Sequence, residues 1–88
     1  MSPNPVAVHQ LKCWVSNFQA TVEGMKTHEF RKDDRGYRIG DELFLSEFDP
    51  DTETLTGRNF RVRVTWITRS FGVPEGYCVM SVKPIVES

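Results

Sequence analysis

The strongest constraint on the fold is an alternation of side chains between residues 58 and 68. Phe60, Val62, Val64 and Trp66 occupy every second position, with two arginines and a threonine between them and an isoleucine after them. A period of two is typical of a strand that has one face on the core. The segment therefore predicts a long strand with these four side chains on its core face.

A helical pattern and four further strand patterns accompany this strand. Trp14, Val15, Phe18 and Val22 recur at spacings of three and four, which predicts an amphipathic helix over 15–23, held by Trp14 and Phe18 and ended by Gly24. Apolar or alternating runs predict the other strands, at 6–11, 27–32, 43–48 and 77–82. Turn-forming residues predict loops at 33–36 and 70–76 and a long acidic hairpin loop at 48–57.

These elements predict an α+β fold with about five strands and one main helix after the first strand. One helix cannot cover both faces of such a sheet, so we expect it to curl into a small, partly closed mixed β-barrel, its later strands linked by hairpin-like loops. With 88 residues, the chain is expected to form a single domain over 1–88, with loose termini at 1–5 and 84–88.

Composition is that of a globular protein, with 39% hydrophobic and 26% charged residues. No run approaches the ~20 apolar residues of a membrane span, and the first residues do not resemble a signal peptide. We therefore expect a cytoplasmic protein without a membrane partner. Cys13 and Cys78 lie in apolar runs and are expected to be reduced and buried. With His9 and His28 they show no metal-ligand spacing, so neither a metal nor a cofactor is expected.

Charge is concentrated between residues 26 and 38, with five cations and three carboxylates. If 27–32 is a strand, Thr27, Glu29 and Arg31 share one face, and Lys26 and His28 lie on the other. An adjacent carboxylate and guanidinium would hold each other charged and present N–H donors to a phosphate, a carboxylate or a base edge. The alternative is a surface ion pair worth ~0–1 kcal/mol.

Charge also segregates in the second half of the chain. Residues 41–53 contain six acids and no base, and residues 58–69 contain four arginines and no acid. Arg61, Arg63 and Arg69 fall on one face of the predicted strand, where like charges repel unless an anion neutralises them. This favours a polyanion such as RNA or DNA, and pairing with the nearby acids is the alternative.

Aromatic rings would add surfaces on which bases stack. Tyr37 and Phe71 lie in predicted loops and are the best candidates for that role. The other aromatic residues considered are expected in the core first, because they fall on apolar faces: Trp14, Phe60, Trp66 and Tyr77.

The residues Gly24-Met25-Lys26-Thr27-His28-Glu29-Phe30-Arg31 match the pattern Gly-x-Lys-x-x-Glu-x-Arg. In this motif, and over about residues 8–83, the chain resembles the ASCH domains of the PUA-like superfamily, in a branch of small bacterial and phage domains of unassigned function. The resemblance implies a small β-barrel with a cleft between helix and barrel, lined by the motif's lysine, glutamate and arginine.

The same resemblance implies two activities. PUA-like relatives bind RNA, and some ASCH proteins are amidohydrolases that remove an acyl group from acetylated cytidine with a lysine, a threonine and a glutamate. Lys26 matches that lysine, but Glu29 occupies the threonine position, which puts the activity in doubt. Thr27 is nearby, and Glu75 would stand in for the later acid.

The leading hypothesis is an RNA-binding or nucleotide-binding module rather than an enzyme. Lys26 and Arg31 would contact phosphate or base, and Glu29 would orient Arg31. The electropositive surface would be extended by Lys32, Arg35, Arg61, Arg63 and Arg69. One alternative is a metal-independent amidohydrolase acting on an acylated nucleoside through Lys26, Glu29 and Glu75. Another is a protein-interaction domain that uses the acidic segment Asp49–Glu53.

Overall fold

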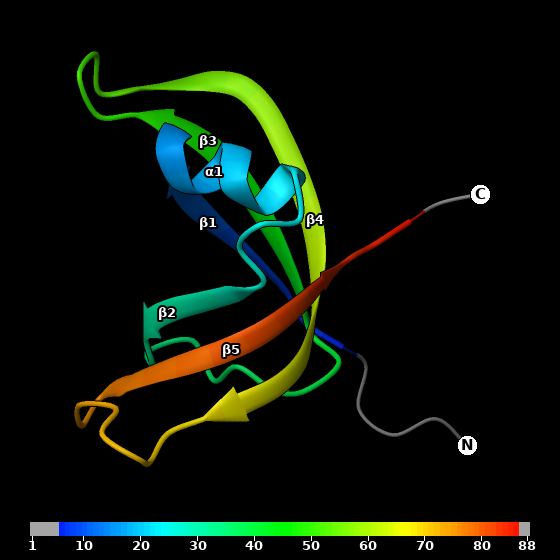
Figure 1. Ribbon diagram of the computed structural model, residues 1–88, viewed down its shortest axis with the longest axis vertical. Coiled ribbons are helices and arrows are strands. Elements are labelled where there is room, and N and C mark those ends of the chain that lie inside the picture. The colour runs from blue at the N-terminus through cyan, green and yellow to red at the C-terminus, as the bar shows by residue number, and fades with distance from the viewer. Residues whose placement is uncertain (1–5, 87–88) are drawn as a thin grey trace.

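The computed structural model describes residues 6–86 as a curved mixed sheet with one helix beside it (Figure 1). In chain order its elements are β1 (Val8–Trp14), α1 (Val15–Val22), β2 (His28–Lys32), β3 (Glu42–Asp49), β4 (Thr54–Thr68) and β5 (Tyr77–Pro84). The strand order is β1-β3-β4-β5-β2, with β1 and β3 parallel and the other pairs antiparallel. The predicted α+β class and partly closed mixed barrel are confirmed, since the sheet curls into a half-barrel.

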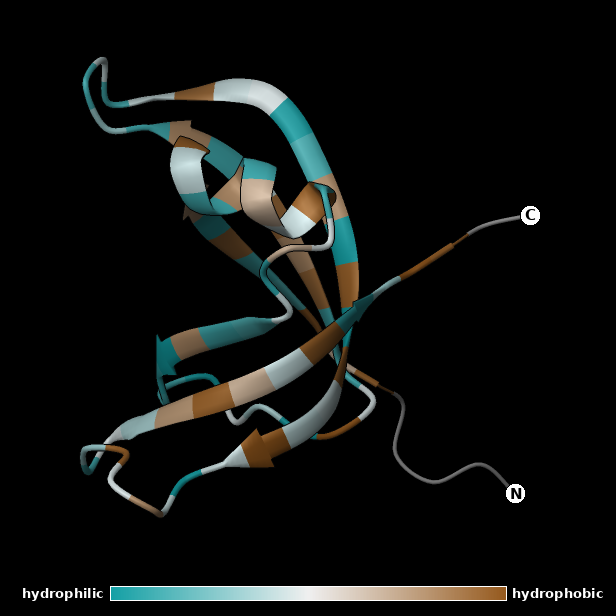
Figure 2. Cartoon of the chain, in the orientation of Figure 1, coloured by the Kyte–Doolittle hydropathy of each residue, from teal (hydrophilic) through white to brown (hydrophobic). Residues whose placement is uncertain are grey.

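The concave side of the sheet forms the core together with α1. Figure 2 shows hydrophilic and hydrophobic residues alternating along the strands, as a sheet with one buried face requires. Val62 and Val64 of β4 are buried as predicted, and Phe18 of α1 packs into the same cluster. The Phe18 ring meets the edge of Phe60 at a centroid distance of 6.4 Å. The remaining buried hydrophobic residues are Leu11, Cys13, Tyr37, Leu43, Leu45, Cys78, Met80 and Val82.

The end of α1 directs the chain toward β2. Gly24 has φ +78°, which favours glycine, and its N–H donates to the Thr21 carbonyl at 3.1 Å. The Met25 N–H donates to the Ala20 carbonyl at 2.9 Å. These two bonds form a Schellman motif, so the predicted stop at Gly24 is confirmed. Residues 25–27 then connect the helix to β2, and the Thr27 carbonyl accepts from the Val82 N–H at 3.0 Å.

The predicted acidic loop at 48–57 is wrong in its bounds. β3 continues to Asp49 and β4 begins at Thr54, with Phe48 paired to Leu55, so the turn is confined to residues 50–53. The turn-forming residues do mark the reversal of the chain. The threonines around Leu55, however, favour a strand, because β-branched side chains pack well on a pleated surface.

A β-bulge overturns the predicted burial of Trp66. Val64 pairs with Val82 and Trp66 pairs with Ser81, so Thr65 is an extra residue in β4. An inserted residue reverses the alternation of faces beyond it. As a result Trp66 is 62% exposed, and Ile67 packs against the core in its place.

Three other predictions for aromatic residues are also wrong. Trp14 ends β1 and follows the strand alternation rather than the helical period, so it points outward and is 57% exposed. Tyr77 is exposed on β5, whereas Tyr37, predicted in an open loop, is buried against the His9 ring at a centroid distance of 4.7 Å. Phe71 is exposed as predicted.

Connections and termini also differ from expectation. β2 pairs with β5, so hairpins link β3 to β4 and β4 to β5, whereas β2 and β3 are not neighbours. The first strand starts at Val8 rather than Val6 and continues to Trp14. Pro84 belongs to β5 and the Ile85 N–H donates to the Arg61 carbonyl at 3.0 Å, so the last strand runs past its predicted end at residue 82. Residues 1–5 and 87–88 lie outside the described residues.

Candidate functional site

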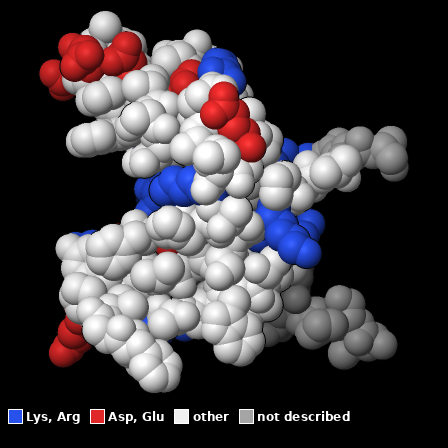
Figure 3. Space-filling model, in the orientation of Figure 1, with Lys and Arg blue, Asp and Glu red and all other residues white. Residues whose placement is uncertain are grey.

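A cleft of about 330 Å³ opens where the end of β1 and the start of α1 face β2. It is lined by Lys12, Cys13, Trp14, Asn17, Lys26, His28, Glu29, Phe30 and Arg31. In the space-filling view, lysine and arginine side chains gather at the waist of the molecule, between the part that contains α1 and the part that contains β2 and β5 (Figure 3). The predicted Lys26, Glu29 and Arg31 thus meet in one concave site.

A buried carboxylate shared by two cations forms the centre of the cleft. Glu29 is 2% exposed. Its Oε1 accepts from Arg31 Nε at 2.9 Å and lies 2.8 Å from Arg31 Nη2, and its Oε2 accepts from Lys26 Nζ at 3.1 Å. The prediction that Glu29 and Arg31 lie side by side on one face of β2 is confirmed.

The predicted position of Lys26 is wrong. Alternation from residue 27 placed Lys26 on the face opposite Glu29, but β2 begins at His28 and the preceding residues do not follow its pleat. The long side chain therefore bends back, and its ammonium also donates to the His28 carbonyl. Lys26 therefore lies in the same cluster as Glu29 and Arg31, although the alternation of side chains predicted it on the opposite face.

Arg31 spans the gap between the two edge strands of the half-barrel. Its Nη2 donates to the Lys12 carbonyl of β1 at 3.0 Å, while Nε and Nη2 face Glu29. These contacts use Nε and Nη2 and leave the two N–H groups of Nη1 available within the described part of the chain. Because two cations share one carboxylate, the Lys26–Glu29–Arg31 cluster carries a net positive charge.

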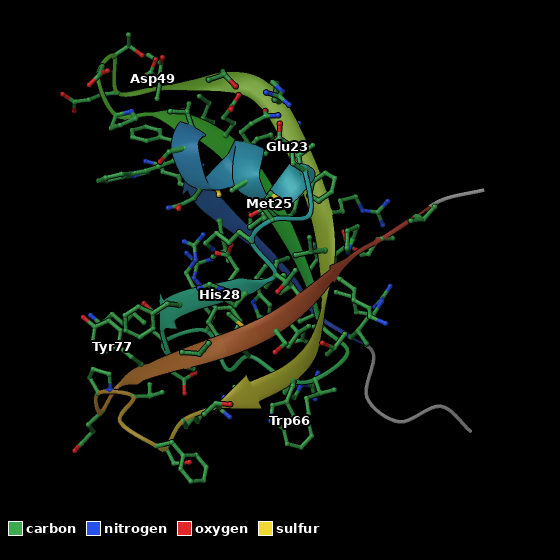
Figure 4. All side chains as sticks on the ribbon, viewed as in Figure 1. Glu23, Met25, His28, Asp49, Trp66 and Tyr77 are labelled. Carbon is green, nitrogen blue, oxygen red and sulfur yellow. The ribbon has the colours of Figure 1, made fainter. Side chains whose placement is uncertain are left out.

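Two exposed rings flank this charge. Trp14 and Phe30 both line the cleft and keep more than half of their surface in solvent. The Phe30 ring also lies against Tyr77, with the centroids 5.5 Å apart and the planes tilted by 32°. In Figure 4, His28 lies on β2 below the turn that carries Met25, and Tyr77 lies at the far end of β5. The site thus combines apolar ring surfaces with N–H donors, as small-molecule sites commonly do.

Cys13 lines the cleft but is not poised as a nucleophile. Burial and the nearby Glu29 carboxylate raise the pKa of its thiol to about 11, so the thiol is protonated at neutral pH. Burial likewise raises the pKa of Cys78. Both cysteines are free and buried, as predicted.

Lys32 and Arg35 lie beside a second, smaller cavity. It has a volume of about 180 Å³ and is lined by Leu11, Arg31, Lys32, Asp34, Arg35 and Tyr37. Arg35 Nη1 donates to the Gln10 carbonyl of β1 at 3.0 Å, and its Nε lies 4.0 Å from an Asp34 carboxylate oxygen. Arg31 lines both cavities.

The strand arginines do not line the cleft. Arg61 and Arg63 share one face of β4 as predicted, but Arg69 does not, so a face common to all three is wrong. Arg61 forms a two-pronged ion pair with Glu42, with Nε and Nη2 at 2.7 and 3.0 Å from its oxygens. Arg63 donates to the Gly40 carbonyl at 2.9 Å. Arg69 lies beyond the bulge and the end of β4, and its guanidinium pairs with the carboxylate of Asp33. Intramolecular acceptors therefore engage all three.

Two residues considered for hydrolysis also lie outside the cleft. Glu75 is exposed in the loop before Tyr77, which pairs with Lys32 at the far end of β2 from Lys26. Strand β2 alone places His28, which is next to the Lys26 ammonium, ~13 Å from Lys32. Glu75 is therefore not placed to act with Lys26. Thr27 is exposed beside the cleft and does not line it.

A buried pair between His9 and Asp41 supports the loop that follows β2. Asp41 accepts from His9 Nε2 at 2.9 Å and from the Ala7 and Arg38 N–H groups at 3.1 and 2.9 Å. Burial would raise the pKa of Asp41, but these hydrogen bonds outweigh it and hold the pKa below its usual value. The Asp41 carboxylate therefore ties the loop at residues 38–41 to Ala7 and to His9 of β1.

Sequence reasoning missed several cleft residues. Lys12 and Trp14 face outward because β1 runs past Leu11, where the prediction ended it. Asn17 lies in the first turn of α1. Extending the alternation from His9 through Cys13 would have placed Lys12 and Trp14 on one outward face.

Two further observations concern residues 6–86. No group of three or more His, Cys, Asp or Glu side chains in this range is arranged to hold a metal ion. Within the same range no helix has the length and apolar character needed to cross a membrane.

Comparison with known proteins identifies a family without an assigned function. A family model described as a domain of unknown function, DUF3850, matches residues 8–82, so the chain belongs to this family. The chain is also similar to a protein of Escherichia phage P2 described as an uncharacterized 12.9 kDa protein in the GpA 3' region, with 39% identity over 61 residues. That match covers 69% of this chain and 54% of the phage protein, so the chain spans about half the length of this relative.

Proposed function

We propose that this member of the DUF3850 family binds a nucleotide, free or within RNA, in the cleft between β1, α1 and β2. The observation that carries the proposal is the Glu29 carboxylate, 2% exposed, with Lys26 and Arg31 on either side. A purely structural ion pair needs one cation for one carboxylate. Here a second cation leaves positive charge in a concave site, where it favours a phosphate.

Each side chain has a defined role in the proposed complex. Arg31 Nη1 and the Lys26 ammonium donate to phosphate oxygens, and Glu29 fixes the direction of both cations before the ligand arrives. Such pre-organisation reduces the entropy lost on binding. Trp14 and Phe30 offer ring faces to the base, which is how proteins hold unpaired bases. A cleft of about 330 Å³ has the size of a small-ligand site.

The resemblance to ASCH domains of the PUA-like superfamily supports the same proposal. The implied cleft between helix and barrel, lined by the lysine, glutamate and arginine of the motif, corresponds to the position of Lys26, Glu29 and Arg31 in this fold. A fold-level likeness alone is weak support for function. The geometry of these three side chains therefore carries more of the argument than the resemblance does.

Direct binding measurements test the proposal. Isothermal titration with cytidine monophosphate and with a short single-stranded RNA should give saturable binding that Lys26→Ala/Arg31→Ala weakens about 100-fold or more, because two charged hydrogen-bond donors are lost. Arg61→Ala/Arg63→Ala is the matched control, since it also removes two cations but outside the cleft, and it should retain parental affinity. Parental affinity in the cleft variant would overturn the proposal.

A second variant protects this test from a folding defect, since the double substitution leaves Glu29 buried without a counterion. Trp14→Ala removes an exposed ring and unbalances no charge. We expect it to keep the circular dichroism spectrum of the parent and to lose about tenfold in affinity for RNA. A folded Trp14→Ala protein with unchanged affinity would count against the base-stacking part of the proposal.

The amidohydrolase alternative has less support. Its lysine and one carboxylate are present as Lys26 and Glu29, but Glu75 and Thr27 lie outside the cleft and the Cys13 thiol is protonated at neutral pH. Incubation with N-acetylated cytidine tests it directly. Release of acetate that stops in a folded Lys26→Ala protein would establish the alternative.

A further inference from the structure

The seam between the two edge strands, β1 and β2, continues beyond the cleft. No backbone ladder joins these strands in the described sheet, where β1 pairs with β3 and β2 with β5. Two guanidinium groups span the seam instead. Arg31 donates to the Lys12 carbonyl and Arg35 donates to the Gln10 carbonyl, each at 3.0 Å.

Both cavities open along this seam, and Arg31 lies between them. The larger cavity holds Lys26, Glu29 and the Trp14 and Phe30 rings, and the smaller one holds Lys32, Arg35, Asp34 and Tyr37. The two bridged carbonyls of β1 are two residues apart, a spacing of ~7 Å along a strand. One nucleotide of a single strand spans such a distance, so consecutive nucleotides can occupy the two cavities.

We infer that the ligand of the seam is a single-stranded oligonucleotide held across two adjacent subsites, with the phosphate between two nucleosides on Arg31. This inference rests on the proposed nucleotide binding in the larger cavity and adds to it the length of the ligand. Arg31 Nη1 is the donor to the bridging phosphate. Lys32, which is exposed, and Arg35 contact the next phosphate along the seam, which in the dinucleotide pCpC is the 5′-phosphate.

Charge along the seam favours a polyanion over a peptide. The cavity linings contain five cations, namely Lys12, Lys26, Arg31, Lys32 and Arg35. They contain two carboxylates, Glu29 and Asp34. Both carboxylate oxygens of Glu29 are paired, one with Lys26 and one with Arg31. Asp34 is 56% exposed, and its nearest carboxylate oxygen is as far as 4.0 Å from Arg35 Nε. An extended chain of phosphates would match this line of cations.

The dependence of affinity on ligand length tests the inference. Cytidine monophosphate and the dinucleotide pCpC are titrated into the parent, Lys32→Ala/Arg35→Ala and the control Arg63→Ala. We expect pCpC to bind the parent about tenfold more tightly than the monophosphate, as an added phosphate contact should. The Lys32→Ala/Arg35→Ala protein should lose this gain and keep its affinity for the monophosphate, and Arg63→Ala should change neither.

The single variant Lys32→Ala is measured as well, because Arg35 bridges to β1, whereas the exposed Lys32 side chain forms no hydrogen bond or ion pair among the described residues. It should lose part of the gain while the fold is kept. Equal affinity for pCpC and the monophosphate, or a gain that survives in Lys32→Ala/Arg35→Ala, would overturn the second subsite and leave mononucleotide binding intact. Absence of binding to both ligands would instead overturn the proposed function itself, and with it this inference.

Discussion

Two carboxylate–guanidinium pairs use the same edge of the guanidinium but lie in different surroundings. In both, an arginine presents Nε and Nη2 to a glutamate: Arg31 to Glu29 and Arg61 to Glu42. The first pair lies in a cleft between exposed rings and shares its carboxylate with Lys26. The second lies on the outer face of the sheet, opposite the buried Leu43. The two pairs thus differ in the concave surroundings of Glu29 and in its hydrogen bond from Lys26, and the proposed site rests on these two features.

The largest expected difference between the two pairs is in stability. Glu29→Gln leaves the half-buried Lys26 and Arg31 without an anion, and we expect it to lower the free energy of unfolding by ~3 kcal/mol. Glu42→Gln should cost clearly less, because the Arg61 side chain is 39% exposed and stays hydrated. Urea unfolding of both variants at pH 7 measures this. Equal losses in the free energy of unfolding would show that Glu29 contributes no more to stability than Glu42 does.

The second expected difference is in the salt dependence of RNA binding. Each phosphate contact with a single strand contributes about −0.7 to the slope of log K against log salt concentration. Lys26→Ala should therefore make the slope shallower by about 0.7, whereas Arg61→Ala should leave it unchanged. Fluorescence anisotropy with a labelled short RNA between low and moderate salt measures both slopes. A shift of the slope in Arg61→Ala would place the phosphates on the outer face.

The smallest expected effect is in the pH dependence of stability. The hydrogen bond from Arg61 outweighs burial and holds the pKa of Glu42 below its usual value. The pair therefore stabilises the fold above the pKa that Glu42 has in the unfolded chain, and this contribution disappears as the pH falls through the lower folded pKa.

Urea unfolding of the parent and Arg61→Ala measures this effect. The parent should be slightly more stable than the variant at pH 7, and the difference should close below about pH 4. A difference that persists in acid would mean that Arg61 stabilises the fold by packing rather than by charge.

Much of the fold could be predicted from the sequence because its signals are local. Alternation located the buried Val62 and Val64, and Gly24 marked the end of the helix. The bulge at Thr65 could not be predicted, since an extra residue depends on pairing with β5 rather than on any residue type. The same bulge moved Trp66 out of the core, and β2 pairs with a strand more than forty residues away.

The candidate site could be predicted only in part. Glu29 and Arg31 share a face by the rule of alternation, so their contact was accessible. The approach of Lys26 depends on the chain before β2, and the part played by Lys12 and Trp14 depends on where β1 ends. The strand arginines were misplaced because charge density in a sequence does not reveal which acceptors the fold brings to each guanidinium. The carboxylates that pair with Arg61 and Arg69 are those of Glu42 and Asp33, which lie in other segments of the chain.

The most direct test of the cleft is an NMR titration of nitrogen-15-labelled protein with a short single-stranded RNA. The account predicts amide shifts that cluster at residues 12–17 and 26–31 and saturate with RNA concentration, while residues 61–63 stay unchanged. Shifts confined to residues 61–69, or no shifts at all, would contradict the assignment of the cleft between β1, α1 and β2 as the binding site.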